Sequence, residues 1–283
     1  MIRRVFGWTG VEVPVIGQGT WMIEGSREAE RRAIEALCTG LDLGMTHIDT
    51  AEMYGSGRAE ELVAEAIAGR RHEVFLVSKV LPSNASYKGT IAACERSLKR
   101  LGTGWLDLYL LHWPGRYPIA ETMRAMEDLV AAGKIRHLGV SNFDLGELQA
   151  AERALKRERI ACNQVLYHLG DRGIERRLIP YCQSRGIAVV GYSPFGHGDF
   201  PSPRSAAGRT LAEVAERHGR TPRQTVLNFL TRQPGVFSIP KSSRSQHTRE
   251  NSAGAGWSLD PEGLAAIGGA FPAPDHDVPL GML

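Results

Sequence analysis

Residues 46–80 read THIDTAEMYGSGRAEELVAEAIAGRRHEVFLVSKV and contain the unit from which the fold of the chain can be predicted. A strand-like run ends at Asp49, a helical pattern begins near Arg58, and a nearly continuous apolar run ends around Lys79. The apolar residues of the helical part recur at the spacing of one helix face, at Ala59, Leu62, Val63, Ala66 and Ile67. This order predicts two parallel strands joined by a right-handed crossover helix.

The same unit repeats along the chain. Strand-like runs are expected at residues 15–21, 46–49, 74–80, 106–113, 135–142, 160–167, 187–193 and 236–242. Helical patterns are expected at residues 27–44, 58–69, 90–102, 121–133, 145–158, 174–186, 210–219, 221–233 and 245–254. Eight such units predict an α/β protein whose sheet closes into a (β/α)8 TIM barrel. No stretch resembles a linker, so residues 1–283 are expected to form a single barrel domain.

Both ends of the chain depart from this repeat. Residues 3–16, RRVFGWTGVEVPVI, have the pattern of two short strands around a turn, and we expect a β-hairpin that caps the bottom of the barrel. Residues 271–283 contain three prolines and no periodicity. They are expected to form a loop near the site.

Composition excludes several classes of protein. Of the 283 residues, 42% are hydrophobic and 23% are charged, and the net charge of +3 is dispersed, so we expect no nucleic-acid partner. No apolar run approaches the ~20 residues of a membrane span, and no secretory signal is evident. Four cysteines stand far apart without a CxxC motif, as expected of reduced thiols in the cytoplasm.

The strand ends carry the candidate site, because chemistry in this fold occurs at the C-terminal ends of the strands. Each of the eight runs ends in a polar or aromatic group: Trp21, Asp49, Lys79, His112, Ser141 with Asn142, Gln164, Tyr192 with Ser193, and Lys241. One such residue could be chance. Eight of them are expected to converge on one rim.

Asp49, Tyr54, Lys79 and His112 form a chemically sensible set. A free phenol has a pKa of about 10, and a neighbouring ammonium group lowers that pKa. We therefore expect Lys79 to tune Tyr54 and Asp49 to hold Lys79 in place. His112 can orient a substrate carbonyl by a hydrogen bond. This set protonates an oxygen but supplies no electrons.

At this level the chain strongly resembles the aldo-keto reductase superfamily, and most of all its bacterial methylglyoxal and small-aldehyde reductases. The matching stretches are IGQGTW (16–21), HIDTAEMYG (47–55), VFLVSKV (74–80), LDLYLLHWP (106–114), GKIRHLGVSNF (133–143), NQVLYH (163–168), GYSPFG (191–196) and FSIPKS (237–242). The resemblance places the catalytic tetrad of the family on Asp49, Tyr54, Lys79 and His112. It implies NADPH-dependent reduction of small aldehydes and ketones by a monomer, with Tyr54 as proton donor.

The resemblance also implies how the cofactor is held. Ser141, Asn142 and Gln164 are expected on the nicotinamide amide, Tyr192 against the ring, and Lys241 with Ser242 on the 2′-phosphate. The further implied contacts are Gly19, Thr20, Trp21, Asp49, Ser193, Pro194, Phe195, Ile239, Pro240, Arg244, His247, Glu250 and Asn251. The substrate pocket is expected between Trp21, Tyr54, His112 and Trp113.

One position departs from the family pattern. Many NADP-preferring members have an arginine six residues after the lysine of IPKS, where this chain has His247. Arg244 is available instead, so we expect NADPH to be preferred and NADH to be used more weakly.

Two alternatives stay open at this stage, and a third is disfavoured. The protein could bind NADP(H) as a regulatory or redox-sensing subunit with little turnover, or its physiological direction could be the oxidation of a polyol or alcohol. His47, His112 and His137 could suggest a metal hydrolase, but His137 lies in mid-strand and Lys79 would repel a cation, so no metal is expected.

Overall fold

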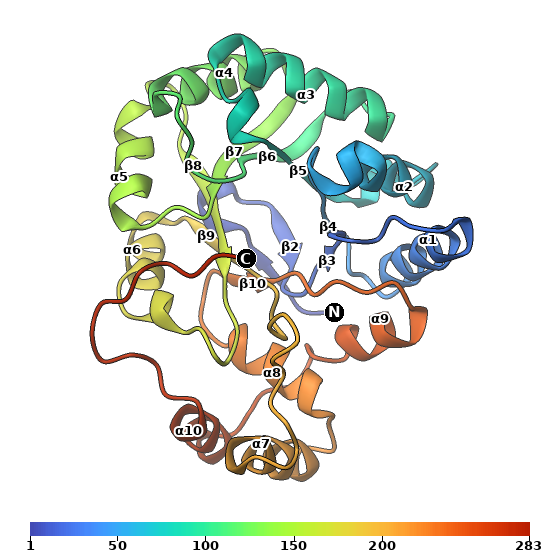
Figure 1. Cartoon of the computed structure of the whole chain (residues 1–283), viewed down its shortest axis with the longest axis vertical. Coiled ribbons are helices and arrows are strands. Elements are labelled where there is room, and N and C mark those ends of the chain that lie inside the picture. The colour runs from blue at the N-terminus through green and yellow to red at the C-terminus, as the bar shows by residue number, and fades with distance from the viewer.

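The strands of the barrel follow one another around the ring in chain order, and the computed structural model describes all residues 1–283 (Figure 1). They are β3 (Gln18–Gly19), β4 (His47–Asp49), β5 (Phe75–Val80), β6 (Leu106–Leu111), β7 (Ile135–Ser141), β8 (Ile160–Leu166), β9 (Ala188–Tyr192) and β10 (Val236–Ser238). Neighbouring strands in this series pair in parallel. All eight predicted strands are confirmed.

The ring closes between β10 and β3. The backbone amide of Gly17 donates to Ser238 O at 2.8 Å, and that of Gly19 donates to Pro240 O at 3.1 Å. Parallel bridges pair Ile16 with Ser238 and Gly19 with Lys241. The first and last strands therefore lie side by side, and the predicted (β/α)8 barrel is confirmed.

Helices cover the outside of the ring (Figure 1). They are α1 (Arg27–Asp42), α2 (Arg58–Ala66), α3 (Tyr87–Leu101), α4 (Ile119–Ala131), α5 (Leu145–Ala154), α6 (Leu178–Arg185), α7 (Ala206–Arg217), α8 (Pro222–Leu230), α9 (Ser245–Ser252) and α10 (Pro261–Ala270). Side chains cap several of their starts: the N-cap Asp144 of α5 accepts from the backbone amide of Glu147, whose side chain bonds back to the amide of Asp144.

Four helix predictions need correction. Helix α6 begins at Leu178 and not at residue 174, because a separate 3-10 turn (Gly173–Glu175) precedes it, and α7 begins at Ala206 and not at residue 210, because Ser205 caps its start. Helix α10 was not predicted, because its three glycines weaken its helical pattern, although Asp260 as N-cap and Pro261 at the first position favour a helix start. Helix α5 ends at Ala154 and not near residue 158. The amides of residues 156–158 donate instead to the buried carboxylate of Glu127.

The predicted hairpin caps the bottom of the barrel. Strands β1 (Arg3–Val5) and β2 (Glu12–Pro14) pair antiparallel. Between them, the Phe6 ring lies 5.0 Å from those of Phe75 and Phe237, at the starts of two barrel strands. The Trp8 indole donates to Ile160 O at 2.7 Å. The bottom is thus filled by apolar side chains, which leaves the opposite rim as the open end.

Two apolar clusters make the core. The larger one lies between the strands and the surrounding helices, and the smaller one, which includes Phe6, Val77, Leu110 and Phe237, fills the barrel interior. No helix combines the length and the apolar character needed to cross a membrane.

Candidate active site

A cavity of about 410 Å³ opens at the C-terminal ends of the strands. Its lining residues are Gly19, Thr20, Trp21, Asp49, Met53, Tyr54, His112, Trp113, Ser141, Asn142, Gln164, Tyr192, Ser193, Ile239, Lys241, Met282 and Leu283. Fourteen of these seventeen were expected from the sequence, and Met53, Met282 and Leu283 were not. The strand-end residues do converge on one rim.

Lys79 lies beneath the floor of this cavity, and its side chain is fully buried. Its ammonium donates to Asp49 Oδ1 at 2.5 Å, to Thr50 O at 2.9 Å and to the Tyr54 hydroxyl at 3.1 Å. The other carboxylate oxygen of Asp49 accepts from Gln164 Nε2 at 2.7 Å. An acid, an ammonium and a phenol thus form one continuous chain that ends at the pocket.

Burial and neighbouring charges have opposite effects on the pKa values of Lys79 and Tyr54. Burial acts to lower the pKa of Lys79, but Asp49 and Tyr54 outweigh it and raise that pKa, so the side chain is an ammonium. Burial raises the pKa of Tyr54, and the opposing effect of Lys79 does not cancel it. Lys79 thus lowers the pKa of Tyr54 as expected, but burial, whose depth the sequence does not show, raises that pKa by more. Tyr54 stays protonated at neutral pH.

His112 stands beside this chain as a neutral ring. Its centroid lies 5.7 Å from that of Tyr54 at 75°, and Trp113 packs against it at 4.7 Å. Burial, with a further contribution from Lys79, lowers the pKa of His112 to about 2. Nδ1 is buried without a partner. A neutral imidazole carries one N–H that can donate to a carbonyl oxygen.

The amide side chains of the rim are tied to one another. The Tyr192 hydroxyl donates to Asn142 Oδ1 at 2.8 Å, and Asn142 Nδ2 donates to His112 O at 3.1 Å. Ser141 Oγ accepts a longer bond of 3.3 Å from Asn142. Gln164 keeps one N–H and its carbonyl oxygen free for a ligand, since its only bond is to Asp49.

A cationic surface lies between β10 and the start of α9. Ser242 Oγ donates to Arg244 O at 2.8 Å and accepts from its amide at 3.2 Å, which fixes the turn into the helix. Arg244 is the N-cap of α9 and provides no side-chain cap, and its guanidinium makes no ion pair. Lys241 and His247, which lie close to Arg244 in the sequence, are also exposed.

The remaining expected cofactor residues lie away from the cavity. Glu250 accepts from Thr221 Oγ1 at 2.7 Å, Asn251 is buried, and Pro240 closes the barrel through its carbonyl. Pro194 and Phe195 line a separate cavity of about 160 Å³.

The three histidines of the metal alternative do not meet. His47 is buried with its ring edge-on to Phe6 and Phe75, and His137 packs against Trp8 at the other end of the barrel from His112. No three His, Cys, Asp or Glu side chains lie close enough together to hold a metal ion.

Known proteins are similar to this chain in both sequence and architecture. The model of the aldo/keto reductase family matches residues 15–270. The chain belongs to the aldo/keto reductase family. It is 42% identical to the methylglyoxal reductase YeaE of Escherichia coli over 100% of both chains, and 36% identical to the glyoxal reductase of Bacillus subtilis over 86% of this chain and 83% of that protein.

Solved structures agree with this assignment. An aldo-keto reductase of Klebsiella pneumoniae in complex with NADPH has a TM-score of 0.94 and 42% identity over 100% of both chains. A second structure of an aldo/keto reductase from that organism, in complex with NADP and acetate, has a TM-score of 0.93 and 42% identity over 99% of each chain. The protein is thus an oxidoreductase with an aldo/keto reductase fold.

Strained backbone gathers at the rim of this aldo/keto reductase. The four non-glycine residues with positive φ are Met22, Ser56, Asn142 and Ser193, at 59°, 54°, 59° and 49°. Each follows a barrel strand, β3, β4, β7 and β9 respectively. Strain of this kind persists where surrounding contacts over-determine the backbone, as at binding and catalytic sites.

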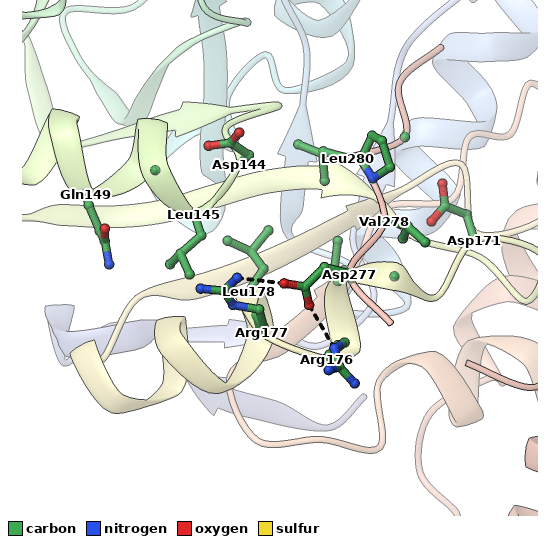
Figure 2. A pocket seen from close by; sticks show the side chains of 15 residues that line it. Asp144, Leu145, Gln149, Asp171, Arg176, Arg177, Leu178, Asp277, Val278 and Leu280 are labelled. Carbon is green, nitrogen blue, oxygen red and sulfur yellow. Dashed lines mark hydrogen bonds and ion pairs between the residues drawn. The ribbon is translucent and has the colours of Figure 1, made fainter. Parts of the chain in front are cut away.

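The tail of the aldo/keto reductase brings Met282 and Leu283 to the cavity. It runs from α10 past α6 to the mouth of the barrel (Figure 1). Arg176 Nε and Arg177 Nη1 both bond the Asp277 carboxylate, at 2.8 and 2.7 Å, and Figure 2 shows the two guanidinium groups on either side of it. The expectation of a loop near the site is confirmed, and the residues that anchor it come from the start of α6.

Proposed function

We propose that the protein reduces small aldehydes and ketones, methylglyoxal among them, to alcohols with NADPH. The observation that carries this proposal is the buried Asp49–Lys79–Tyr54 chain, whose phenol opens into a pocket. The names of the Escherichia coli and Bacillus subtilis relatives support the choice of small dicarbonyl substrates.

The residues around the cavity fit NADP(H). Gln164 has hydrogen-bonding capacity left for the nicotinamide amide, beside Ser141 and Asn142, and Tyr192 offers an aromatic face. The charge of Arg244 is unpaired beside free N-terminal amides of α9, as suits a phosphate group. When bound, the cofactor supplies the hydride.

Residues of the protein itself carry out the proton transfer. Tyr54 donates it to the carbonyl oxygen, and Lys79 stabilises the phenolate that forms. Asp49 keeps Lys79 charged and in place. The neutral His112 donates a hydrogen bond to the same oxygen and orients the carbonyl.

The walls set the size and polarity of the substrate. Trp21, Met53, Trp113, Met282 and Leu283 surround the phenol with mostly apolar surface, which suits small, uncharged carbonyls. We further propose that residues 1–283 act as one domain and as a monomer in the cytoplasm, where four free cysteines stay reduced.

The test is a substrate panel with the purified protein, in which the loss of NADPH absorbance reports carbonyl reduction. Methylglyoxal and an aromatic aldehyde are compared with NADPH and NADH, and a polyol series is compared in the reverse direction with NADP+ and NAD+, where the absorbance of the reduced cofactor rises. We expect NADPH-dependent reduction of methylglyoxal. Cofactor binding without turnover of any carbonyl would overturn the proposal and favour a regulatory role.

A further inference from the structure

Two buried carboxylates, those of Glu52 and Glu60, tie the loop that carries Tyr54 to strand β5. Glu52 lies two residues before Tyr54 and is 8% exposed, and Glu60 lies in the first turn of α2 and is fully buried. Neither touches the cavity. Buried carboxylates are costly to keep unless they are bonded, so their partners indicate what they do.

Glu52 holds the loop to the end of β5. Its Oε1 accepts from the backbone amide of Leu81 at 2.8 Å and from Asn84 Nδ2 at 2.9 Å, and its Oε2 lies 3.4 Å from the Arg96 guanidinium. Leu81 follows Lys79 by two residues. This contact therefore fixes the Tyr54 loop just beyond the lysine.

Glu60 holds the other side of the loop. Its Oε1 accepts from Ser78 Oγ at 2.6 Å and its Oε2 from Arg100 Nε at 2.5 Å. Ser78 directly precedes Lys79 on β5. A Cβ on Gly57 would lie 2.6 Å from Arg100 Cδ, so the arginine also packs tightly under the end of the loop.

The loop between these two contacts has a strained backbone. Gly55, Ser56 and Gly57 all have positive φ, at 54°, 54° and 96°, and Ser56 has no glycine freedom to adopt such an angle. A backbone of this kind relaxes unless its surroundings fix it. The hydroxyl of Tyr54 must nonetheless stay 3.1 Å from Lys79 Nζ.

We propose that Glu52 and Glu60 are positioning residues for proton transfer, which fix the Tyr54 loop on both sides of Lys79. The inference rests on the proposed carbonyl reduction. A displacement of about 1 Å at a reacting group can cost on the order of 100-fold in rate. The two carboxylates thus act on kcat through geometry, without contact with substrate or cofactor.

The test uses two variants that weaken one contact each. Glu52→Ala removes the acceptor for Leu81 N, and Ser78→Ala removes the hydroxyl that bonds Glu60 without leaving Arg100 unpaired. We expect kcat to fall about 10- to 100-fold in Glu52→Ala and by a smaller factor in Ser78→Ala, with the KM for NADPH changed less than about 2-fold. Glu52→Gln keeps an acceptor oxygen and should restore most of kcat.

The pH profile separates this role from general stability. The titratable groups around Tyr54 are Asp49, Lys79, His112 and Tyr192. Of these, Lys79 lowers the pKa of Tyr54. A phenol that moves away from Lys79 should therefore lose activity only at higher pH, and the alkaline limb of kcat should shift upward in Glu52→Ala.

Glu127→Ala is the matched control. Glu127 is also a buried carboxylate that accepts backbone amides, but those amides precede β8, at the end of the barrel away from the site. It should lower stability without shifting the alkaline limb or reducing kcat. Equal kinetics in Glu52→Ala and Glu127→Ala would overturn the proposal.

Amide hydrogen exchange of residues 51–57 gives a readout without turnover. We expect faster exchange in Glu52→Ala than in wild type, and no change there in Glu127→Ala. Unchanged exchange in Glu52→Ala would also overturn the proposal. If the wild type reduces no carbonyl, the proposed function fails, whereas this exchange still decides whether the carboxylates fix the loop.

Discussion

Lys79 Nζ lies 3.1 Å from the hydroxyl of Tyr54, and the ammonium group also lies 4.8 Å from the centre of the phenol ring. The lysine is fully buried, so little water screens its charge from the phenol. Removal of a proton from Tyr54 leaves an anion beside a fixed cation. In the proposed mechanism, this contact stabilises the phenolate that proton transfer to a substrate leaves behind.

Replacement of Tyr54 by phenylalanine tests the proton donor. We expect Tyr54→Phe to lose roughly 10²- to 10⁴-fold in kcat, the usual range for general acid catalysis, while NADPH binding measured by fluorescence titration stays intact. More than a tenth of the wild-type kcat, with chemistry rate-limiting, would remove Tyr54 from this role.

Replacement of Lys79 by methionine tests its charge. Lys79 lowers the pKa of Tyr54, so its loss raises that pKa further and the alkaline limb of the kcat profile should move to higher pH, with a lower rate at neutral pH. Asp49 would then keep Gln164 alone as a side-chain partner, so a loss of stability is also expected. An unchanged pH profile would argue against this electrostatic role.

The fold was largely predictable because its signals are local. Eight apolar runs, such as those that end in Asp49 and Lys79, alternate with amphipathic helical patterns. This order allows few topologies. Helix α10 was not predicted because Gly263, Gly268 and Gly269 interrupt its apolar pattern, and only the N-cap Asp260 indicates where it begins.

The site was predictable where a residue lies at a strand end and less so elsewhere. Met282 and Leu283 reach the cavity because Asp277 pairs with arginines 100 and 101 residues away in the chain, a contact that no local pattern reveals. The Tyr54 pKa has the same limitation. The sequence shows the neighbouring charge, but burial depends on the packing of the whole rim.

The burial of His47 predicts that the protein loses stability in acid. Burial, with a contribution from Lys79, lowers its pKa to about 3, whereas a histidine in the unfolded chain has a pKa of about 6.5. Below pH ~6.5 the unfolded state binds a proton that the folded state does not, so the stability present above that pH is progressively lost as the pH falls toward 3.

Between pH 7 and 5 this histidine should cost about 2 kcal/mol of unfolding free energy. His47→Met fills much of the same space between Phe6 and Phe75 and cannot titrate. Urea unfolding at both pH values should therefore show a smaller difference in the variant. An equal difference in both proteins would contradict the assignment.

The anchor of the tail should affect the substrate more than the cofactor. Asp277→Asn removes the ion pairs with Arg176 and Arg177 and should loosen the segment that brings Met282 and Leu283 to the pocket. Because both pairs are partly exposed, we expect only a roughly 2- to 5-fold rise in the KM for methylglyoxal. High salt should raise the wild-type KM in the same direction.

Asp275→Asn is the control for the tail. It removes the same charge two residues away, where the carboxylate is 99% exposed and pairs only with His276. Its KM for methylglyoxal should equal that of wild type. A rise of the same size in both variants would show that net charge, and not the Asp277 contact, is responsible.

Arg244 should select NADPH over NADH. Its guanidinium makes no ion pair, and it precedes α9, whose first amides are free of a side-chain cap. A charge-assisted bond to the 2′-phosphate is worth about 1.5–3 kcal/mol, or roughly 10- to 150-fold in affinity. Because His247 stands where many relatives have a second arginine, the preference should be real but weaker than in those relatives. The measurement is kcat/KM for both cofactors in wild type, Arg244→Ala and Arg249→Ala, an exposed arginine of the last turn of the same helix. We expect the NADPH/NADH ratio to fall at least 10-fold in Arg244→Ala and to stay unchanged in Arg249→Ala. Equal use of the two cofactors by the wild type, or an unchanged ratio in Arg244→Ala, would show that the phosphate is held elsewhere.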